Sequence, residues 1–234
     1  MLEHFRELIR ILIPQNTRKT ILKYHQNYVF KKAIHEFRNS PDPTKISDDL
    51  IARLIYGWGN QGYSAMNGLV KEIIAQANEN QGPVLECGTG LSTVLLGIMG
   101  DIKGQPVVSL EDHSEWARFI RDRVTALGIQ SVEIVECPLE QYENYYWYKV
   151  PDAVRKYQYS LVISDGPADK SQLARYGLMP QMQSSLSDKC TILFDDYDYA
   201  SYRVSVDKWM DEYPFEIVVK KNEDVIAILK NKSN

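Results

Sequence analysis

The chain has 234 residues, 44% hydrophobic and 25% charged, which is the composition of an ordinary folded protein of one or two domains. Its net charge of -4 argues against a general nucleic-acid binder, and no stretch is long and apolar enough to span a bilayer. Three cysteines without metal-ligand spacing and a start without a signal-peptide core predict a cytoplasmic protein with reduced thiols.

The first 43 residues predict a basic helical extension. Apolar residues recur at helical spacing over 4–13, and a second helix is expected over 17–37. Residues 1–40 carry eight Lys or Arg and three acids, so a charge of +5 there stands against -9 in the remainder. Packing on the domain or on a second subunit, as in a homodimer, is the favoured interpretation. Peripheral contact with an anionic membrane surface or an acidic partner is the alternative.

Two prolines predict a domain boundary after residue 43, so that residues 44–234 form the ligand-binding domain. Ser47 is placed to cap a helix that ends near Tyr56. A glycine-rich loop follows, before a helix that begins near Ser64. Trp58 lies in this loop and is expected either to cover a ligand as a lid or to fill a buried corner.

The stretch 83–93 carries the clearest functional pattern. It predicts a buried strand, a tight loop with Gly88 and Gly90, and a helix opened by a hydroxylated pair that includes Ser92. Glycines at these positions let a ligand approach the backbone, and the unpaired N–H groups at a helix start face the same space. The loop therefore predicts a nucleotide-like ligand.

Two side chains narrow the choice of ligand. Thr93 stands where a dinucleotide site has its third glycine, and Glu86 would repel phosphate but could pair with a cation. A phosphate-free, positively charged nucleoside such as S-adenosylmethionine fits this loop. The sequence from Glu86 to Gly90 resembles the first motif of the class I methyltransferases, which implies cofactor binding by Glu86, Gly88, Gly90 and Ser92.

After residue 83 strands and helices alternate, which predicts a parallel sheet with helices on both faces. Strands are expected over 106–110, 132–135, 159–164 and 190–194, with a closing antiparallel hairpin over 215–220 and 225–229. The resemblance implies the complete fold class: a doubly wound, mostly parallel seven-stranded α/β sheet of the Rossmann-like methyltransferase type, with the N-terminal helices as an extension.

Two further residues are expected to contact the cofactor. Glu111 ends the second strand 21 residues beyond Gly90, near the offset at which an acid meets the ribose hydroxyls in nucleotide-binding folds. Leu139 follows the third strand, where the resemblance implies contact with the adenine ring. The dense aromatic run over 142–148 is expected either to cover a small-molecule site or to pack without ligand contact.

Three acids end the fourth and fifth strands of the parallel sheet: Asp165, Asp195 and Asp196. Ligands of such sheets bind beyond the carboxyl ends of the strands, and carboxylates are suited to Mg²⁺ or another divalent cation. The arrangement resembles the metal site of the catechol-type O-methyltransferases, which implies catalytic and metal-binding roles for these acids and a cofactor contact for Asp165. The Asp-Asp pair departs from the usual Asp-Asn. The combined motifs resemble a bacterial subgroup found with glycan and natural-product pathways.

The favoured hypothesis is an S-adenosylmethionine-dependent O-methyltransferase acting on a small molecule or a sugar or glycan precursor, with no nucleic-acid partner. An NAD(P)-dependent oxidoreductase is the first alternative, which Thr93 and the lack of a hydride-site pair disfavour. A non-catalytic adaptor that binds a membrane or a protein is the second. Arg175 is expected either to bind an acidic acceptor or to lie on a solvated helix face.

Overall fold

The computed structural model describes residues 14–59, 66–168, 171, 173–221 and 223–232. The chain divides into two compact units, residues 1–64 and 65–234, and each is described by itself. The helix predicted over 4–13 and the helix start near Ser64 lie outside the described residues. The boundary predicted after residue 43 stays a prediction.

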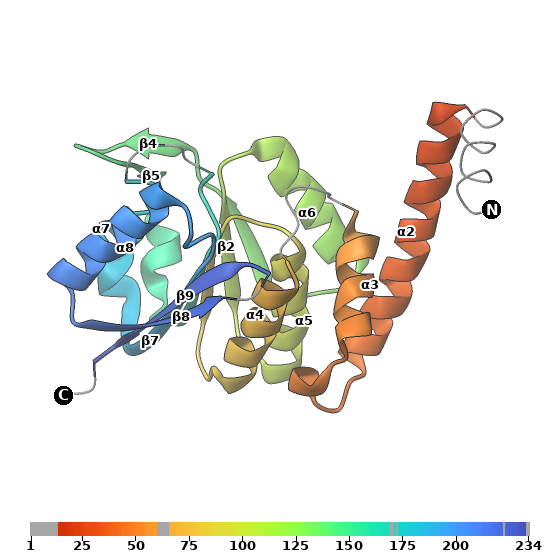
Figure 1. Cartoon of the computed structure of the whole chain (residues 1–234), viewed down its shortest axis with the longest axis horizontal. Coiled ribbons are helices and arrows are strands. Elements are labelled where there is room, and N and C mark those ends of the chain that lie inside the picture. The colour runs from red at the N-terminus through yellow and green to blue at the C-terminus, as the bar shows by residue number, and fades with distance from the viewer. Residues whose placement is uncertain (1–13, 60–65, 169–170, 172, 222, 233–234) are drawn as a thin grey trace. The chain divides into compact units, whose positions relative to one another are not determined.

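The first unit is built from helices α2, Gln15–Arg38, and α3, Asp48–Trp58, joined through the short turn η1, Pro43–Lys45 (Figure 1). As predicted, Ser47 caps α3: its Oγ accepts a hydrogen bond of 3.1 Å from the Leu50 amide. The helices pack through apolar side chains that recur every three or four residues, among them Phe30, Ile34, Phe37, Ile51 and Leu54.

Trp58 is the last residue of α3 and not part of a loop. Its side chain is 5% exposed, and its ring lies 5.6 Å from that of Phe30. A side chain on neighbouring Gly57 would meet the Phe30 backbone at 2.7 Å, so the glycine allows the helices to approach. The lid interpretation of Trp58 is wrong, because its ring is used in helix packing.

Helix α2 carries several exposed apolar side chains. Ile21, Leu22, Tyr24 and Tyr28 have between 44% and 73% of their surface accessible, among lysines and arginines. The membrane or subunit contact predicted for residues 1–40 stays a prediction. Among the helices of the described part of the chain, none has the length and apolarity that crossing a membrane requires.

The second unit is organised around a seven-stranded sheet, as predicted. Its order is β3-β2-β1-β6-β7-β9-β8; the first five strands are parallel, and β9 runs antiparallel to both of its neighbours. The strands are β1 Val84–Cys87, β2 Val107–Glu111, β3 Val132–Glu136, β6 Tyr159–Ser164, β7 Leu186–Phe194, β8 Phe215–Lys221 and β9 Val225–Asn231. Strands β1 and β2 are buried along their whole length, as expected where helices cover both faces.

Helices cover the two faces of this sheet, α4 to α6 on one and α7 and α8 on the other (Figure 1). Their bounds are α4 Asn67–Glu79, α5 Leu91–Lys103, α6 Ser114–Ala126, α7 Leu178–Met182 and α8 Ala200–Glu212, with short turns η2 Asp152–Lys156 and η3 Gln183–Ser185. Leu85 and Cys87 point to the face that α8 covers through Trp209, and Glu86 therefore points to the opposite face. The alternation of side chains along β1 therefore determines which residues the Glu86 carboxylate contacts.

The aromatic run forms the turn and the second strand of a two-stranded hairpin that the sequence did not reveal: β4, Leu139–Gln141, pairs with β5, Tyr146–Tyr148. Trp147 and Tyr148 are completely buried. The run therefore contributes mainly to the core. All three cysteines are buried and free, in agreement with reduced packing thiols.

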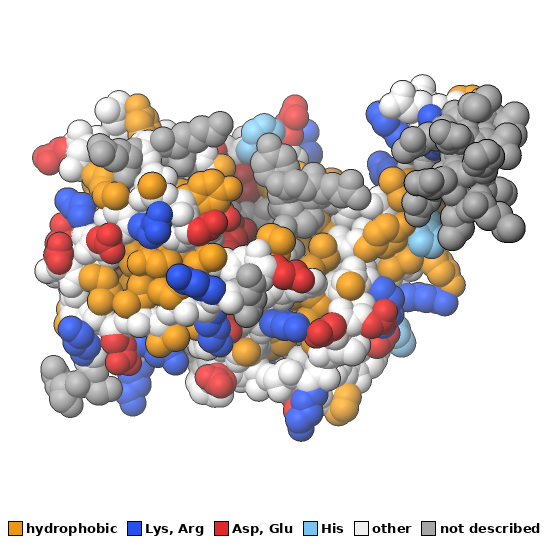
Figure 2. All heavy atoms as spheres, in the orientation of Figure 1, with side chains coloured by type: hydrophobic (Ala, Val, Ile, Leu, Met, Phe, Trp, Pro, Cys, Tyr) orange, Lys and Arg blue, Asp and Glu red, His pale blue; other side chains and the backbone are white. Residues whose placement is uncertain are grey.

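Strand β8 forms one edge of the sheet. Val218 and Val219 are 57% and 37% exposed there, and Figure 2 shows hydrophobic surface broken up by charged side chains over the region of β8 and β9. Charged residues beside exposed valines keep an edge strand from pairing with another chain.

The turn between β8 and β9 caps α4 from outside the helix. Asp224 Oδ2 accepts a 2.6 Å hydrogen bond from the Leu69 amide, whereas the N-cap residue Met66 makes no side-chain cap. We expect Asp224→Ala to lower the free energy of unfolding by about 1–2 kcal/mol, the usual cost of a lost cap. Urea denaturation measures this, with exposed Asp211→Ala as the control; equal stability of the two variants would contradict the capping role.

Candidate functional site

The predicted site residues lie at one edge of the sheet, at the carboxyl ends of its central strands. The glycine loop follows β1, Glu111 ends β2, Asp165 follows β6, and Asp195 and Asp196 follow β7. The loop after β1 and the loop after β6 lead to helices on opposite faces, which opens the crevice where ligands of such sheets bind.

The two motif glycines have different roles. Gly88 has φ +86°, and a Cβ on it would lie 3.2 Å from the Gly166 amide nitrogen, so two loops meet where only glycine fits. Gly90 is extended at φ -175°, and the nearest atom to a Cβ on it would be Ser92 Oγ, 3.9 Å away. Gly88 therefore serves packing, and Gly90 leaves open a space that a ligand can occupy.

The Glu86 carboxylate lies beneath the loop. Its Oε2 accepts hydrogen bonds from Ser109 Oγ at 2.6 Å and Thr93 Oγ1 at 2.7 Å, and Thr93 Oγ1 accepts one from the Gly90 amide at 2.9 Å. Glu86 is completely buried, which raises its pKa to about 7 although the neighbouring hydroxyls oppose the shift. Glu86 thus supports the loop from below, and the direct cofactor contact stays a prediction.

This buried acid predicts a pH effect on stability. Folding raises the Glu86 pKa from 4.5 to about 7. The protonated carboxyl group therefore contributes to the free energy of unfolding fully below pH 4.5, and this contribution is lost as the pH rises through 7. We expect the stability of Glu86→Gln relative to wild type to increase by about 3 kcal/mol over this range. Urea unfolding from pH 4.5 to 8 measures the difference. The exposed control Glu79→Gln should show no such trend, and a flat Glu86→Gln difference would contradict the assignment.

Glu111 holds the glycine loop from the side. Its Oε2 accepts from the Thr89 hydroxyl at 2.6 Å and the Thr89 amide at 3.1 Å, and its Oε1 accepts from the His113 amide at 3.0 Å. Trp116 Nε1 donates to the Thr89 carbonyl at 2.8 Å. Thr89 and Trp116 are thus site residues that the sequence interpretation missed; the only signal was a polar residue between the two glycines.

The remaining predicted cofactor contacts occupy different environments. Ser92 is buried in the first turn of α5, while Leu139 is 38% exposed at the start of β4. An exposed apolar side chain just beyond β3 is compatible with a ring contact, and the adenine contact of Leu139 stays a prediction.

The structure brings Asp165, Asp195 and Asp196 together: one carboxylate oxygen from each lies within 4.8 Å of the others. Asp196 is in the left-handed region at φ +59°, an uncommon conformation for a non-glycine residue. Burial, and the neighbouring negative charges, raise the pKa of both Asp165 and Asp195. Three ionised acids at this spacing repel one another, and a nearby positive charge offsets that repulsion.

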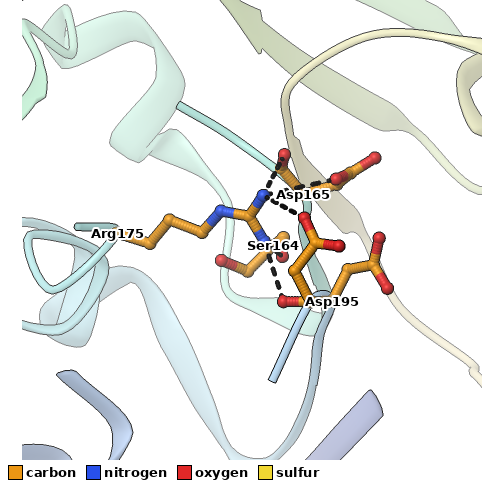
Figure 3. Close-up of polar contacts among 5 residues, drawn as sticks. Ser164, Asp165, Arg175 and Asp195 are labelled. Atoms are coloured by element: carbon orange, nitrogen blue, oxygen red, sulfur yellow. Dashed lines mark hydrogen bonds and ion pairs between the residues drawn. The ribbon is translucent and has the colours of Figure 1, made fainter. Parts of the chain in front are cut away.

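A positive charge comes from Arg175, whose guanidinium points toward the acids (Figure 3). The Arg175 side chain is only 2% exposed. Its guanidinium forms ion pairs with Asp165 Oδ1 at 3.4 Å and Asp196 Oδ2 at 3.3 Å. Both interpretations of Arg175 from the sequence are wrong, because it is neither on a solvated face nor free to bind an acceptor. Its position 10 residues after Asp165 gave no sign of this contact.

The residues present fit both groups that the resemblance implies. The open space at Gly90, next to Thr89, which Glu111 holds through two hydrogen bonds, is suited to a nucleoside cofactor. The buried side-chain atoms that have no hydrogen-bond partner in the described part of the chain include Glu86 Oε1, Tyr148 Oη and Asp195 Oδ1 at this site. Three carboxylates also form an oxygen donor set of the kind that divalent cations use.

The fold is the Rossmann-like methyltransferase fold, with a mostly parallel sheet closed by an antiparallel hairpin. No protein-family model matches the chain, and comparison with curated proteins finds no match. Solved structures of methyltransferases do match in fold.

One is a Staphylococcus aureus protein proposed to be a caffeoyl-CoA O-methyltransferase, with TM-score 0.61 and 14% identity over 89% of this chain and 100% of that one. Another is the SAH-bound methyltransferase PaMTH1 of Podospora anserina, with TM-score 0.55 and 13% identity over 95% and 99%. A third is the precorrin-6y C5,15-methyltransferase of Geobacter metallireducens, with TM-score 0.55 and 13% identity over 74% and 92%. At sequence identities this low, the similarity shows a shared fold and no more.

Proposed function

We propose that the chain is an S-adenosylmethionine-dependent methyltransferase that methylates a hydroxyl oxygen of a small molecule or of a sugar or glycan precursor. One observation carries the proposal: the cofactor loop and the acid cluster are in direct contact. The Asp165 amide donates to the Cys87 carbonyl at 3.1 Å, and the Asp165–Gly166 backbone packs against Gly88. A donor above the loop and an acceptor beside the acids would therefore be neighbours.

The chain's own residues would hold and orient the cofactor. The space above Gly90 would receive it, and Leu139 would offer an apolar contact to the base. Glu111 already accepts hydrogen bonds from the Thr89 hydroxyl, the Thr89 amide and the His113 amide, so about one lone-pair site remains for a ribose hydroxyl. When bound, S-adenosylmethionine supplies a methyl group already activated by its sulfonium charge. The protein's main task is then to align donor and acceptor and to keep water out.

The acid cluster would act on the acceptor. Asp165, Asp195 and Asp196 would hold a divalent cation such as Mg²⁺ through their converging oxygens. When bound, that cation supplies the charge that lowers the pKa of an acceptor hydroxyl. Asp195 Oδ1, buried and without a partner among the described residues, would take up the proton.

The oxidoreductase alternative is not favoured. Thr93, in place of the third glycine, is buried, and its hydroxyl is engaged by Glu86 and the Gly90 amide. The sheet also departs from the dinucleotide-binding order, because antiparallel β9 lies between β7 and β8.

Calorimetric titration separates the hypotheses. We expect S-adenosylmethionine and its demethylated product to bind and NADH and NADPH not to bind. Binding of NADH without S-adenosylmethionine would overturn the proposal. Binding of S-adenosylmethionine with no methyl transfer to a panel of phenolic and sugar hydroxyls, at any divalent cation concentration, would favour the non-catalytic adaptor.

A further inference from the structure

Arg175 joins the carboxyl ends of two neighbouring strands. Its Nη1 donates to the Ser164 carbonyl at 3.1 Å and to the Asp195 carbonyl at 2.9 Å, and its Nη2 donates to the Asp165 carbonyl at 2.7 Å (Figure 3). These carbonyls belong to the ends of β6 and β7, which carry the three acids. One planar guanidinium thus sets the spacing between the loops from which the acids project.

The surroundings of Arg175 hold it in this place. Its guanidinium carbon lies 4.2 Å from the centre of the Tyr202 ring, a cation–π contact. Its backbone is left-handed at φ +63°, and the flanking carbonyls are fixed by Ser205 Oγ, bonded to Ala174 at 2.8 Å, and by Trp209 Nε1, bonded to Tyr176 at 2.9 Å. These contacts on both sides hold Arg175 in its left-handed conformation.

The charges of the three carboxylates and of Arg175 determine how strongly the acid cluster can bind a cation. When all three carboxylates are ionised, as at alkaline pH, one guanidinium leaves two negative charges, which one divalent cation would balance. Two of the three carboxylates already contact Arg175, at 3.3 and 3.4 Å, and a cation bound by the same carboxylates would lie close to the guanidinium. Repulsion between a divalent cation and a guanidinium that share the same carboxylates is strong inside a protein.

We propose that Arg175 is a built-in counter-cation and positioning residue, which holds the acid cluster together before any metal binds and limits its affinity for a divalent cation. This inference rests on the proposed function for the role of the cluster, but its main test is independent of methyl transfer. A weakly held cation can leave with the product, and the arginine keeps the carboxylates in place meanwhile.

The test is Mn²⁺ binding to the full-length protein, followed by isothermal titration and by the paramagnetic signal of free Mn²⁺ at pH 8.5, where protons compete least. We expect Arg175→Met to bind Mn²⁺ about tenfold or more tightly than wild type, with a larger Mn²⁺-induced rise in melting temperature. Arg175→Lys keeps the charge and should stay within about threefold of the wild-type affinity.

Arg155→Met is the matched control, since this guanidinium contacts the Gln181 carbonyl and the Met182 sulfur instead. It should leave Mn²⁺ affinity unchanged. Weaker Mn²⁺ binding by Arg175→Met, or equal tightening by Arg175→Lys, would overturn the proposal, because a merely structural residue cannot tighten cation binding when removed. If Arg175→Met binds Mn²⁺ and the wild type does not, the inference stands, but the role of a metal in the proposed function is refuted. Methyl transfer by the wild type in excess chelator tests that proposed function separately.

Discussion

Replacing Asp195 by Asn is expected to lower kcat about a thousandfold while the Kd for S-adenosylmethionine changes less than about threefold. Asp195 lies in the acid cluster and has a buried, unpartnered Oδ1. An amide of the same shape keeps the packing but removes the negative charge and the basic oxygen on which proton removal would depend. Product formation with saturating cofactor measures the first quantity, and calorimetry measures the second.

Asp198→Asn is the control, since Asp198 lies three residues further along the chain but is exposed. It should retain wild-type kcat. Asp165→Asn should behave like Asp195→Asn, because both residues contribute to the same cluster. Excess chelator should abolish turnover in the wild type as well. Full activity in chelator would exclude the cation, and full activity of Asp195→Asn would remove the cluster from the reaction altogether.

Replacing Gly90 by Val is expected to weaken cofactor binding strongly without unfolding the protein. The extended backbone at φ -175° accepts any residue, and the nearest atom to an added Cβ is 3.9 Å away, so the branched side chain would occupy the space above the loop. We expect the Kd for S-adenosylmethionine to rise at least about a hundredfold, equivalent to about 2.7 kcal/mol. Calorimetry measures the affinity, and thermal denaturation without cofactor measures the stability.

Gly88→Ala gives the opposite pattern and serves as the matched comparison. Its φ of +86° and the Gly166 nitrogen 3.2 Å from an added Cβ mean that even a methyl group strains two loops. This variant should lose stability in the absence of cofactor. Cofactor binding by Gly90→Val with wild-type affinity would show that the ligand lies elsewhere on the sheet edge.

The helices and strands of the second unit could be predicted from local sequence patterns. Buried strands such as Tyr159–Ser164 are short apolar runs that end at polar residues, and their alternation with helices allows few arrangements. The hairpin β4–β5 did not follow, because short strands of mixed aromatic residues have no distinctive period. Trp58 was misplaced because the helix continues through Gly57, which the close approach of Phe30 requires and a local pattern does not reveal.

By itself, the sequence determined that the acids and glycines of the site share one edge of the sheet, because the carboxyl ends of parallel strands come together whatever the loops do. Only the tertiary structure decided what each side chain contacts. Side chains alternate along β1, which places the Glu86 carboxylate beneath the loop with Ser109 and Thr93. The side chain of Arg175 is buried against the Tyr202 ring and therefore makes its hydrogen bonds to the two strand ends instead of to water. Burial of that kind depends on contacts between residues far apart in the chain.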